Sequence, residues 1–322
     1  MASYELAIRS GADFIEPDLV STRDGRLVAR HENEISGTTD VADHPEFAGR
    51  RTTKVVDGRD VRGWFTEDFD LAELKSLRAR ERLPALRPGN TVYDDLFEIP
   101  TLEEVIELAT SEGVGVYAET KHPGYFRSIG LSLEEALLAG LDAAAGRLPA
   151  DAFYIQSFET SNLRRLAGMT DLPLVQLVAC AGAPYDLVEA GDERTYRDLL
   201  TRSGLAEIAS YAAAVGVQKD HIVPRGANGR LLTPTPLIEE AHASGLLVHA
   251  YTFRDENAFL PLEYRRSHPD VATHAQVFGD AFREYSLFYG LGVDGVFSDN
   301  PGRAVAARDS VERIIRSSTV DR

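Results

Sequence analysis

The sequence has a single cysteine, Cys180, and this scarcity excludes two kinds of site. One thiol cannot form an intrachain disulfide, and it cannot supply the several thiolates of a zinc cluster. Cys180 lies in the apolar run 175–181, so we expect a buried structural thiol. No apolar run reaches the length of a membrane span, and no signal peptide precedes the segment ASYELAIRSG. A cytoplasmic protein is expected from the chain as it stands, and an exported form if the true N-terminus lies upstream.

Positive charge is also scarce. The 34 Lys and Arg residues stand against 51 Asp and Glu residues, which gives a formal net charge of −17. This balance argues against nucleic acid or an anionic membrane as the main partner, and it is compatible with hard cations. A hydrophobic content of 43% over 322 residues is sufficient for one large α/β domain or for two ordinary ones.

Residues 14–34, FIEPDLVSTRDGRLVARHENE, contain an unusual pair of acids. Residues 14–20 have the apolar content of a buried strand, yet Glu16 and Asp18 lie within it. Residues two apart on a strand point to the same face, so the two carboxylates are expected to lie together. Asp24-Gly25 predicts a tight turn, and a second extended run after it brings His31 near the acid pair. An edge strand with one solvated face is the competing interpretation.

From residue 99 onwards, strands and helices alternate. Thr101 and Glu104 form a predicted capping box at the start of a helix. The predicted strands that follow are residues 114–119, 153–157, 175–178, 221–223, 247–251 and 295–298, and a helix is predicted at 204–215. Alternation of this kind implies parallel βαβ units, and with the acid strand the count reaches about seven.

Two α/β architectures fit seven such strands: a (β/α)₈ barrel that lacks its first strand, and an open seven-stranded sheet. We favour the barrel because polar residues recur at the carboxyl ends of the strands, where barrel enzymes have their active sites. These residues are Asp18, Glu119, Gln156, Gln176, Arg225, Tyr251 and Asp299. We expect a single barrel domain over residues 1–322.

Residues 37–100 differ from the rest of the chain: they are rich in Thr, Asp, Arg and Gly, with weak periodicity. We interpret this segment as an insertion within the barrel domain, since it has too few apolar residues for a core of its own. A short helix is predicted within residues 68–80. Trp64, the only tryptophan, either lines a pocket or anchors the insertion to the body of the protein.

Three carboxylates, those of Glu16, Asp18 and Glu119, can converge at the mouth of such a barrel. An all-oxygen set of this kind suits Mg²⁺, Ca²⁺ or Mn²⁺ rather than zinc. Lys121 lies two residues after Glu119 on the same face, where it either binds a phosphate or forms an ion pair with Glu119 alone. His31 is the candidate general acid/base.

The predicted strand 247–251 also gives an expectation for one histidine and one arginine. His249 lies inside an apolar strand and is expected to be a core residue. Arg254, just after that strand, either binds phosphate or forms a surface ion pair.

These residues carry a resemblance to a known family. The segments FIEPDLV, Asp24-Gly25 and VARHE resemble the signature of the glycerophosphodiester phosphodiesterases, and YAETK (117–121) resembles their second motif. YTFR (251–254) and FSDNP (297–301) are similar to their last two barrel ends. The insertion, with ISGTTDVADHPEFAGRRTT and GWFTEDF, is similar to the longer GlpQ-like bacterial branch.

The resemblance implies a metal-dependent barrel enzyme that hydrolyses glycerophosphodiesters to glycerol 3-phosphate and an alcohol. It implies one divalent ion, Ca²⁺, Mg²⁺ or Mn²⁺, on Glu16, Asp18 and Glu119, and substrate contacts from Lys121, Tyr251 and Arg254. It also implies two acid/base histidines, of which His31 matches the second.

The first of these histidines belongs to a His-Arg-Gly motif that ends the first barrel strand of the family. In the family a Pro-Glu-Asn-Thr-like turn follows this motif, and by the resemblance the segment Ala2-Ser3-Tyr4 comes just after that turn. The alternative to an active phosphodiesterase is therefore an N-terminally truncated, catalytically impaired barrel that only binds a metal or ligand. A different metal-dependent barrel lyase or phospholipase is the third interpretation.

Overall fold

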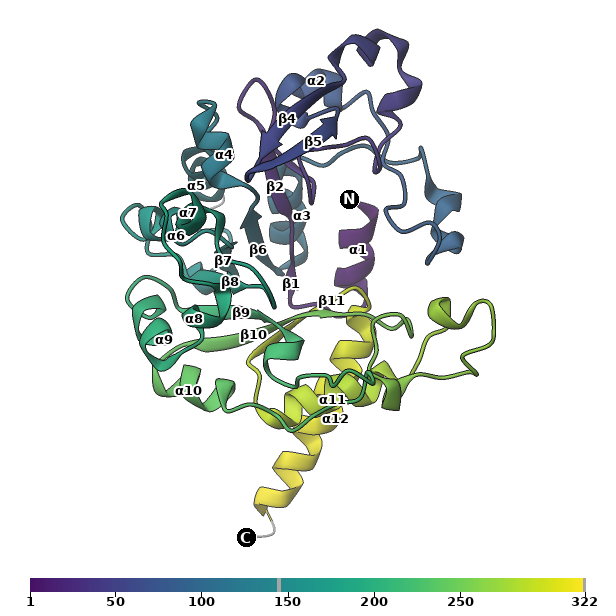
Figure 1. The fold of residues 1–322 in the computed structure, drawn as a ribbon, viewed down its shortest axis with the longest axis vertical. Helices are drawn as coiled ribbons and strands as arrows, with labels where there is room; N and C mark the ends of the chain where they lie inside the picture. The colour runs from purple at the N-terminus through teal and green to yellow at the C-terminus, as the bar shows by residue number, and fades with distance from the viewer. Residues whose placement is uncertain (144–145, 321–322) are drawn as a thin grey trace. The chain divides into compact units, whose positions relative to one another are not determined.

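The computed structural model describes residues 1–143 and 146–320. These residues pack into two compact units, and each is described by itself (Figure 1). Unit 1 consists of Met1–Ile8, Asp13–Pro173 and Tyr185–Ala190; unit 2 consists of Arg9–Ala12, Leu174–Pro184 and the described residues from Gly191 onwards. The expected single barrel domain over residues 1–322 stays a prediction.

The sheet of unit 1 is built around the strand β6. Its members are β1 (Phe14–Ile15), β2 (Asp18–Ser21), β3 (Leu27–Ala29), β6 (Gly115–Thr120) and β7 (Phe153–Ser157). β1, β2 and β7 all pair with β6 in parallel, whereas β3 returns antiparallel to β2. β1 and β2 are thus two halves of one strand line, interrupted at Glu16 and Pro17. Proline has no N–H to donate, but its carbonyl still accepts the N–H of Glu119 at 2.9 Å.

Helices flank this sheet in the expected alternation. They are α1 (Ala2–Arg9), α3 (Leu102–Glu112), α4 (Pro123–Ser128), α5 (Leu133–Asp142), α6 (Thr160–Leu166) and α7 (Tyr185–Glu189). The predicted capping box of α3 is confirmed: the Glu104 N–H donates to Thr101 Oγ1, and the Thr101 N–H donates to Glu104 Oε2. The core of the unit contains fully buried side chains from β2, β6 and β7, including Leu19, Val116 and Ile155.

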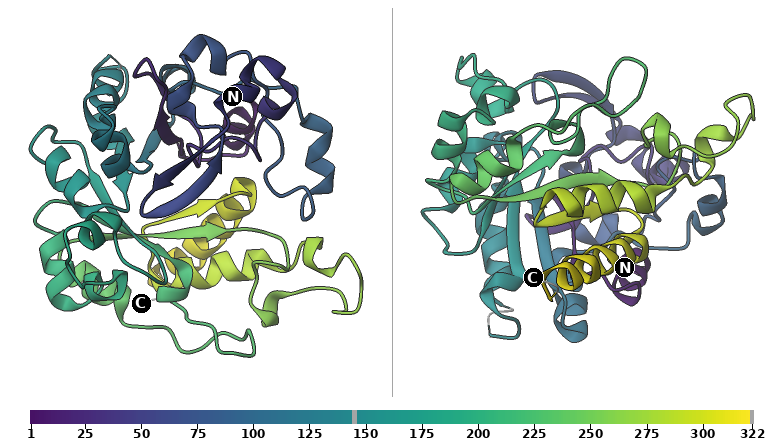
Figure 2. Two further views of the ribbon diagram at one scale, coloured as in Figure 1. Left: turned by 45° about the horizontal axis from the view of Figure 1, so that its top comes forward. Right: turned by 90° about the horizontal axis from the view of Figure 1, so that it is seen from below.

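The insertion belongs to unit 1 and contains little regular structure, as its weak periodicity predicts. It has one hairpin, β4 (Thr52–Val56) and β5 (Arg59–Gly63), and one short helix, α2 (Leu71–Leu74). The hairpin is labelled near the top of Figure 1, beside α2, and Figure 2 shows it from two further sides. The Trp64 indole donates to the Phe47 carbonyl at 2.7 Å, so this side chain anchors one part of the insertion to another.

Unit 2 contains four parallel strands in sequence order: β8 (Leu174–Val178), β9 (Ala214–Gln218), β10 (Leu247–Phe253) and β11 (Gly295–Ser298). Its helices are α8 (Tyr196–Leu199), α9 (Arg202–Ile208), α10 (Leu237–Ala243), α11 (Ala281–Leu291) and α12 (Pro301–Val320). α11 and α12 lie side by side (Figure 1). Among the described residues, no helix has both the length and the apolar character that crossing a bilayer requires.

Three local predictions in unit 2 are wrong, in whole or in part. The predicted strand 221–223 and helix 204–215 are replaced by α9, which ends at Ile208, and β9, which spans Ala214–Gln218. A strand that is buried on both faces shows no alternation of apolar and polar residues. The small apolar residues of β9 therefore fit the pattern of a helix as well as that of a strand. Gly216 marks the strand, because a Cβ there would lie 2.5 Å from Leu177 on β8. Cys180, expected to be buried, is exposed in the loop after β8.

Candidate active site

The three predicted carboxylates converge in unit 1. In the β2–β6 ladder, Asp18 is the direct partner of Glu119, so both side chains leave the sheet on the same face. Glu16 lies at the break before β2. One carboxylate oxygen from each of the three residues lies within 4.8 Å of the others. This spacing and the all-oxygen donor set fit a divalent cation that prefers carboxylate ligands.

Lys121 directs its ammonium group into this cluster. Its Nζ lies 2.7 Å from Glu119 Oε1 and 3.0 Å from Asp18 Oδ1. Burial lowers the pKa of Lys121, but the charges of Glu119 and Asp18 outweigh it and raise the pKa overall. Lys121 therefore contacts two carboxylates, and not Glu119 alone, as one of its two expected roles required.

The cluster holds more negative charge than Lys121 balances. Burial, followed by the charges of Asp18 and Glu119, raises the pKa of Glu16 well above its ordinary value. Burial likewise raises the pKa of Glu119 to about 8. Asp18 differs: burial opposes ionisation, but the charges of Lys121 and His31 lower its pKa overall. Two carboxylates with raised pKa values indicate a site where a further positive charge is favoured.

Gln156 is a site neighbour to which the sequence pattern assigned no role. Gln156 is the direct partner of Glu119 in the β6–β7 ladder, and its Nε2 donates to Glu16 Oε1 at 2.8 Å. Its own Oε1 is buried and, within the described part of the chain, has no hydrogen-bond partner. Its position at the end of a strand was the one signal in the sequence.

Tyr4 on α1 is a second neighbour that the sequence did not single out. Burial, and then the charges of Glu16 and Asp18, raise the pKa of its phenol. The proximity of Tyr4 to the acids depends on how α1 packs, which local sequence does not determine.

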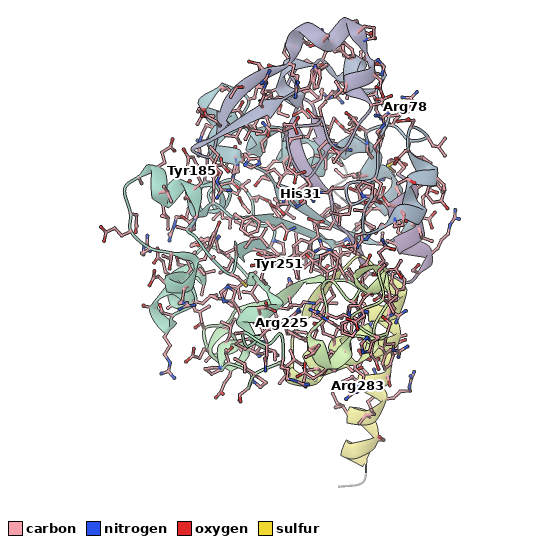
Figure 3. The ribbon with its side chains drawn as sticks, turned by 45° about the vertical axis from the view of Figure 1, so that its right-hand side comes forward. His31, Arg78, Tyr185, Arg225, Tyr251 and Arg283 are labelled. Atoms are coloured by element: carbon pink, nitrogen blue, oxygen red, sulfur yellow. The ribbon has the colours of Figure 1, made fainter. Side chains whose placement is uncertain are left out.

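His31 lies just after β3, as the hairpin pattern predicts, and it is labelled in Figure 3. The Arg30 N–H donates to the Asp18 carbonyl at 2.8 Å, which holds this loop against β2. The His31 Nδ1 lies 2.8 Å from Glu32 Oε1, and the His31 side chain is 50% exposed. The charge of a protonated His31 is one of the causes that lower the pKa of Asp18.

The other two predicted substrate residues lie in unit 2. The Tyr251 hydroxyl donates to the Val178 carbonyl at 2.9 Å. Arg254 forms an ion pair with Asp299, with 2.8 Å between Nε and Oδ2, and its guanidinium lies over the Phe259 ring. Tyr251 is labelled in Figure 3. Their contacts with substrate stay predictions. His249, expected in the core, is buried at 7% exposure.

The family model for the glycerophosphoryl diester phosphodiesterases matches residues 1–303. A glycerophosphodiester phosphodiesterase of Arabidopsis thaliana, GDPD6, is 36% identical over 315 residues, which cover 93% of this chain and 79% of the relative. A glycerophosphodiester phosphodiesterase of Haemophilus influenzae is 28% identical over 338 residues, 95% of this chain and 84% of the relative.

Solved structures give the same fold. A putative glycerophosphoryl diester phosphodiesterase from Silicibacter pomeroyi matches with a TM-score of 0.63 at 17% identity, over 96% of this chain and 87% of that one. An Oleispira antarctica phosphodiesterase, solved with its product sn-glycerol-3-phosphate, matches with a TM-score of 0.58 at 20% identity, over 96% and 90%. The likeness identifies the α/β barrel of these enzymes rather than an open sheet. The chain belongs to the glycerophosphoryl diester phosphodiesterase family and is an enzyme of that class.

Proposed function

We propose that this protein hydrolyses glycerophosphodiesters to glycerol 3-phosphate and an alcohol, with a divalent cation held by Glu16, Asp18 and Glu119. The observation that supports the cation is the convergence of three carboxylate oxygens within 4.8 Å of one another. Burial and the charges of neighbouring carboxylates raise the pKa values of two of these residues, Glu16 and Glu119. The substrate class follows from family membership and from the product bound to the Oleispira antarctica relative.

Each residue of the site has a proposed role. The cation, when bound, polarises a phosphoryl oxygen and offsets the charge that develops on it. Lys121 provides a second positive charge to the phosphate, from a position fixed by Glu119 and Asp18. His31 takes at Nε2 the proton of the water that attacks phosphorus, or gives a proton to the alcohol oxygen as the bond between that oxygen and phosphorus breaks. Tyr251 and Arg254 are proposed to bind the rest of the substrate.

The donor chemistry limits the choice of ion. Carboxylate oxygens, without a thiolate and without a histidine in the cluster, suit Ca²⁺, Mg²⁺ or Mn²⁺ better than zinc. Gln156 adds a neutral amide oxygen next to Glu16 that can accept from a water or hydroxyl.

The test measures glycerol 3-phosphate release from glycerophosphocholine. We expect release to stop in excess EDTA and to return on addition of Ca²⁺, Mg²⁺ or Mn²⁺. Undiminished release in chelator would refute the metal dependence. A protein that is stabilised by these ions in thermal melts but releases no product would instead support the alternative, a barrel that binds a cation without turnover.

A further inference from the structure

The imidazole of His31 has a carboxylate beside it that the proposed reaction does not use. Glu32 Oε1 lies 2.8 Å from His31 Nδ1. An ionised carboxylate can only accept, so this contact places the proton of a neutral imidazole on Nδ1 and leaves Nε2 as the nitrogen that exchanges protons. Because the His31 side chain is half exposed, packing alone does not fix the orientation of the ring.

Glu32 is itself held by the insertion. The guanidinium of Arg82 donates to the same Oε1 of Glu32. Burial raises the pKa of Glu32, but the His31 hydrogen bond and the charges of His31, Arg82 and Lys121 outweigh it, and the pKa is lowered overall. Glu32 is therefore an anion at neutral pH, at a point between the imidazole, an arginine of the insertion and the site lysine.

A second contact fixes the same loop. The Asn33 amide donates to both oxygens of Glu67, at 3.2 and 3.3 Å, and Glu67 also lies in the insertion. Glu67 is buried and accepts from Lys54 at 3.0 Å and from Tyr125 at 2.5 Å. The residues on the C-terminal side of His31 are thus tied to the insertion twice, through Glu32 and through Asn33.

We propose that Glu32, held in place by Arg82, is the positioning residue of His31, and that the insertion thereby sets the orientation and tautomer of the acid/base histidine. A carboxylate adjacent in sequence can rotate away into solvent, and the ion pair with Arg82 opposes this rotation. The inference rests on the proposed function in one respect only, namely that His31 transfers a proton. Carboxylates that orient a metal-bound imidazole typically contribute about 10–100-fold to activity, and we expect an effect of the same order for Glu32 on the imidazole of His31.

The decisive experiment is a double-mutant cycle on glycerophosphocholine turnover. We expect Glu32→Ala to lower kcat by about 10–100-fold with little change in KM or in cation affinity. In a His31→Ala background the same substitution should have no further effect, because Glu32 acts through the imidazole. Equal losses in both backgrounds, or no loss in either, would overturn the proposal.

Variants of the arginine separate orientation from general damage to the insertion. Arg82→Ala should lower kcat, and Arg82→Lys, which keeps a cation beside Glu32, should restore part of it. The matched control is Arg80→Ala: Arg80 lies two residues away and forms ion pairs with Asp95 at 2.7 Å and Asp43 at 2.5 Å, without contact to Glu32. Its kcat should be unchanged. A loss as large as that of Arg82→Ala would assign the effect to the fold of the insertion and overturn the proposal.

Imidazole ¹⁵N NMR provides a readout that does not depend on turnover. The His31 signal, assigned by its absence in His31→Ala, should show the tautomer protonated at Nδ1 in the wild type and a mixture in Glu32→Ala. An identical tautomer in both would overturn the inference. A normal rate for His31→Ala is a different result: it would reject the acid/base role of His31 in the proposed function, while the NMR comparison would still decide whether Glu32 sets the tautomer.

Discussion

The substitution Glu119→Gln tests the charge balance of the acid cluster directly. Glutamine keeps the shape of the side chain but removes one of three clustered carboxylates. Burial raises the pKa of Glu119 from the ordinary 4.5 to about 8. A raised carboxylate pKa means that the folded state retains a proton that the unfolded state has released, so the wild-type protein without a cation loses stability as the pH rises from about 4.5 to about 8. At about 1.4 kcal/mol per pH unit, the full loss over this range is on the order of 5 kcal/mol.

The assay is equilibrium unfolding in EDTA at pH 5.5 and pH 8.5. We expect the wild type to lose more stability than Glu119→Gln between these pH values, because the amide cannot ionise. Adding a cation should reduce this difference at pH 8.5, since a ligand at 100 times its Kd stabilises the wild type by about 2.7 kcal/mol and the variant by less. Glu103→Gln is the control, because Glu103 lies on α3, outside the acid cluster, and forms an exposed ion pair with Arg26. The reasoning fails if wild type and Glu119→Gln show the same pH dependence in chelator, or gain equally from the cation.

Three further substitutions test other parts of the site and core. His31→Ala should lower kcat by about 10²–10⁴ while thermal melts with and without cation stay as in the wild type; a near-normal kcat would make His31 structural. In EDTA, Lys121→Met should lower the free energy of unfolding in urea by about 3–5 kcal/mol, because two buried carboxylates lose the ammonium group that pairs with them. An unchanged unfolding midpoint would contradict this. His249 is buried, which lowers its pKa to about 4 from the ordinary 6.5. The contribution of this residue to folding stability is therefore full above pH 6.5 and is lost as the pH drops towards 4. His249→Leu should flatten that acid limb of the stability curve, and an unchanged limb would count against the buried neutral histidine.

Local sequence was sufficient for the acid pair and its hairpin. Alternation along a strand predicts that Glu16 and Asp18 share a face, and the Asp24-Gly25 turn predicts the return to His31. The capping box at Thr101 and Glu104 is equally local, since its partners are three residues apart. These features could be predicted because every contact lies within one or two neighbouring elements.

Features that depend on tertiary packing could not be predicted in this way. The contact between Arg82 and Glu32 spans 50 residues, and that between Gln156 and Glu16 spans 140. The strand β9 lacks alternation because it is buried on both faces, and its composition therefore resembled that of a helix. Cys180 follows an apolar run but lies beyond the end of the strand, where the chain is exposed.

The pairing of Asp18 with Glu119 across β2 and β6 also has a consequence for folding fidelity. A slip of one residue in this ladder would turn Asp18 to the opposite face, while Glu119 would stay where it is. Only the native alignment of the two strands therefore presents all three carboxylates to one ion. A cation that binds this alignment and no other would favour it by mass action, so the proposed catalytic ion would also select the correct strand register.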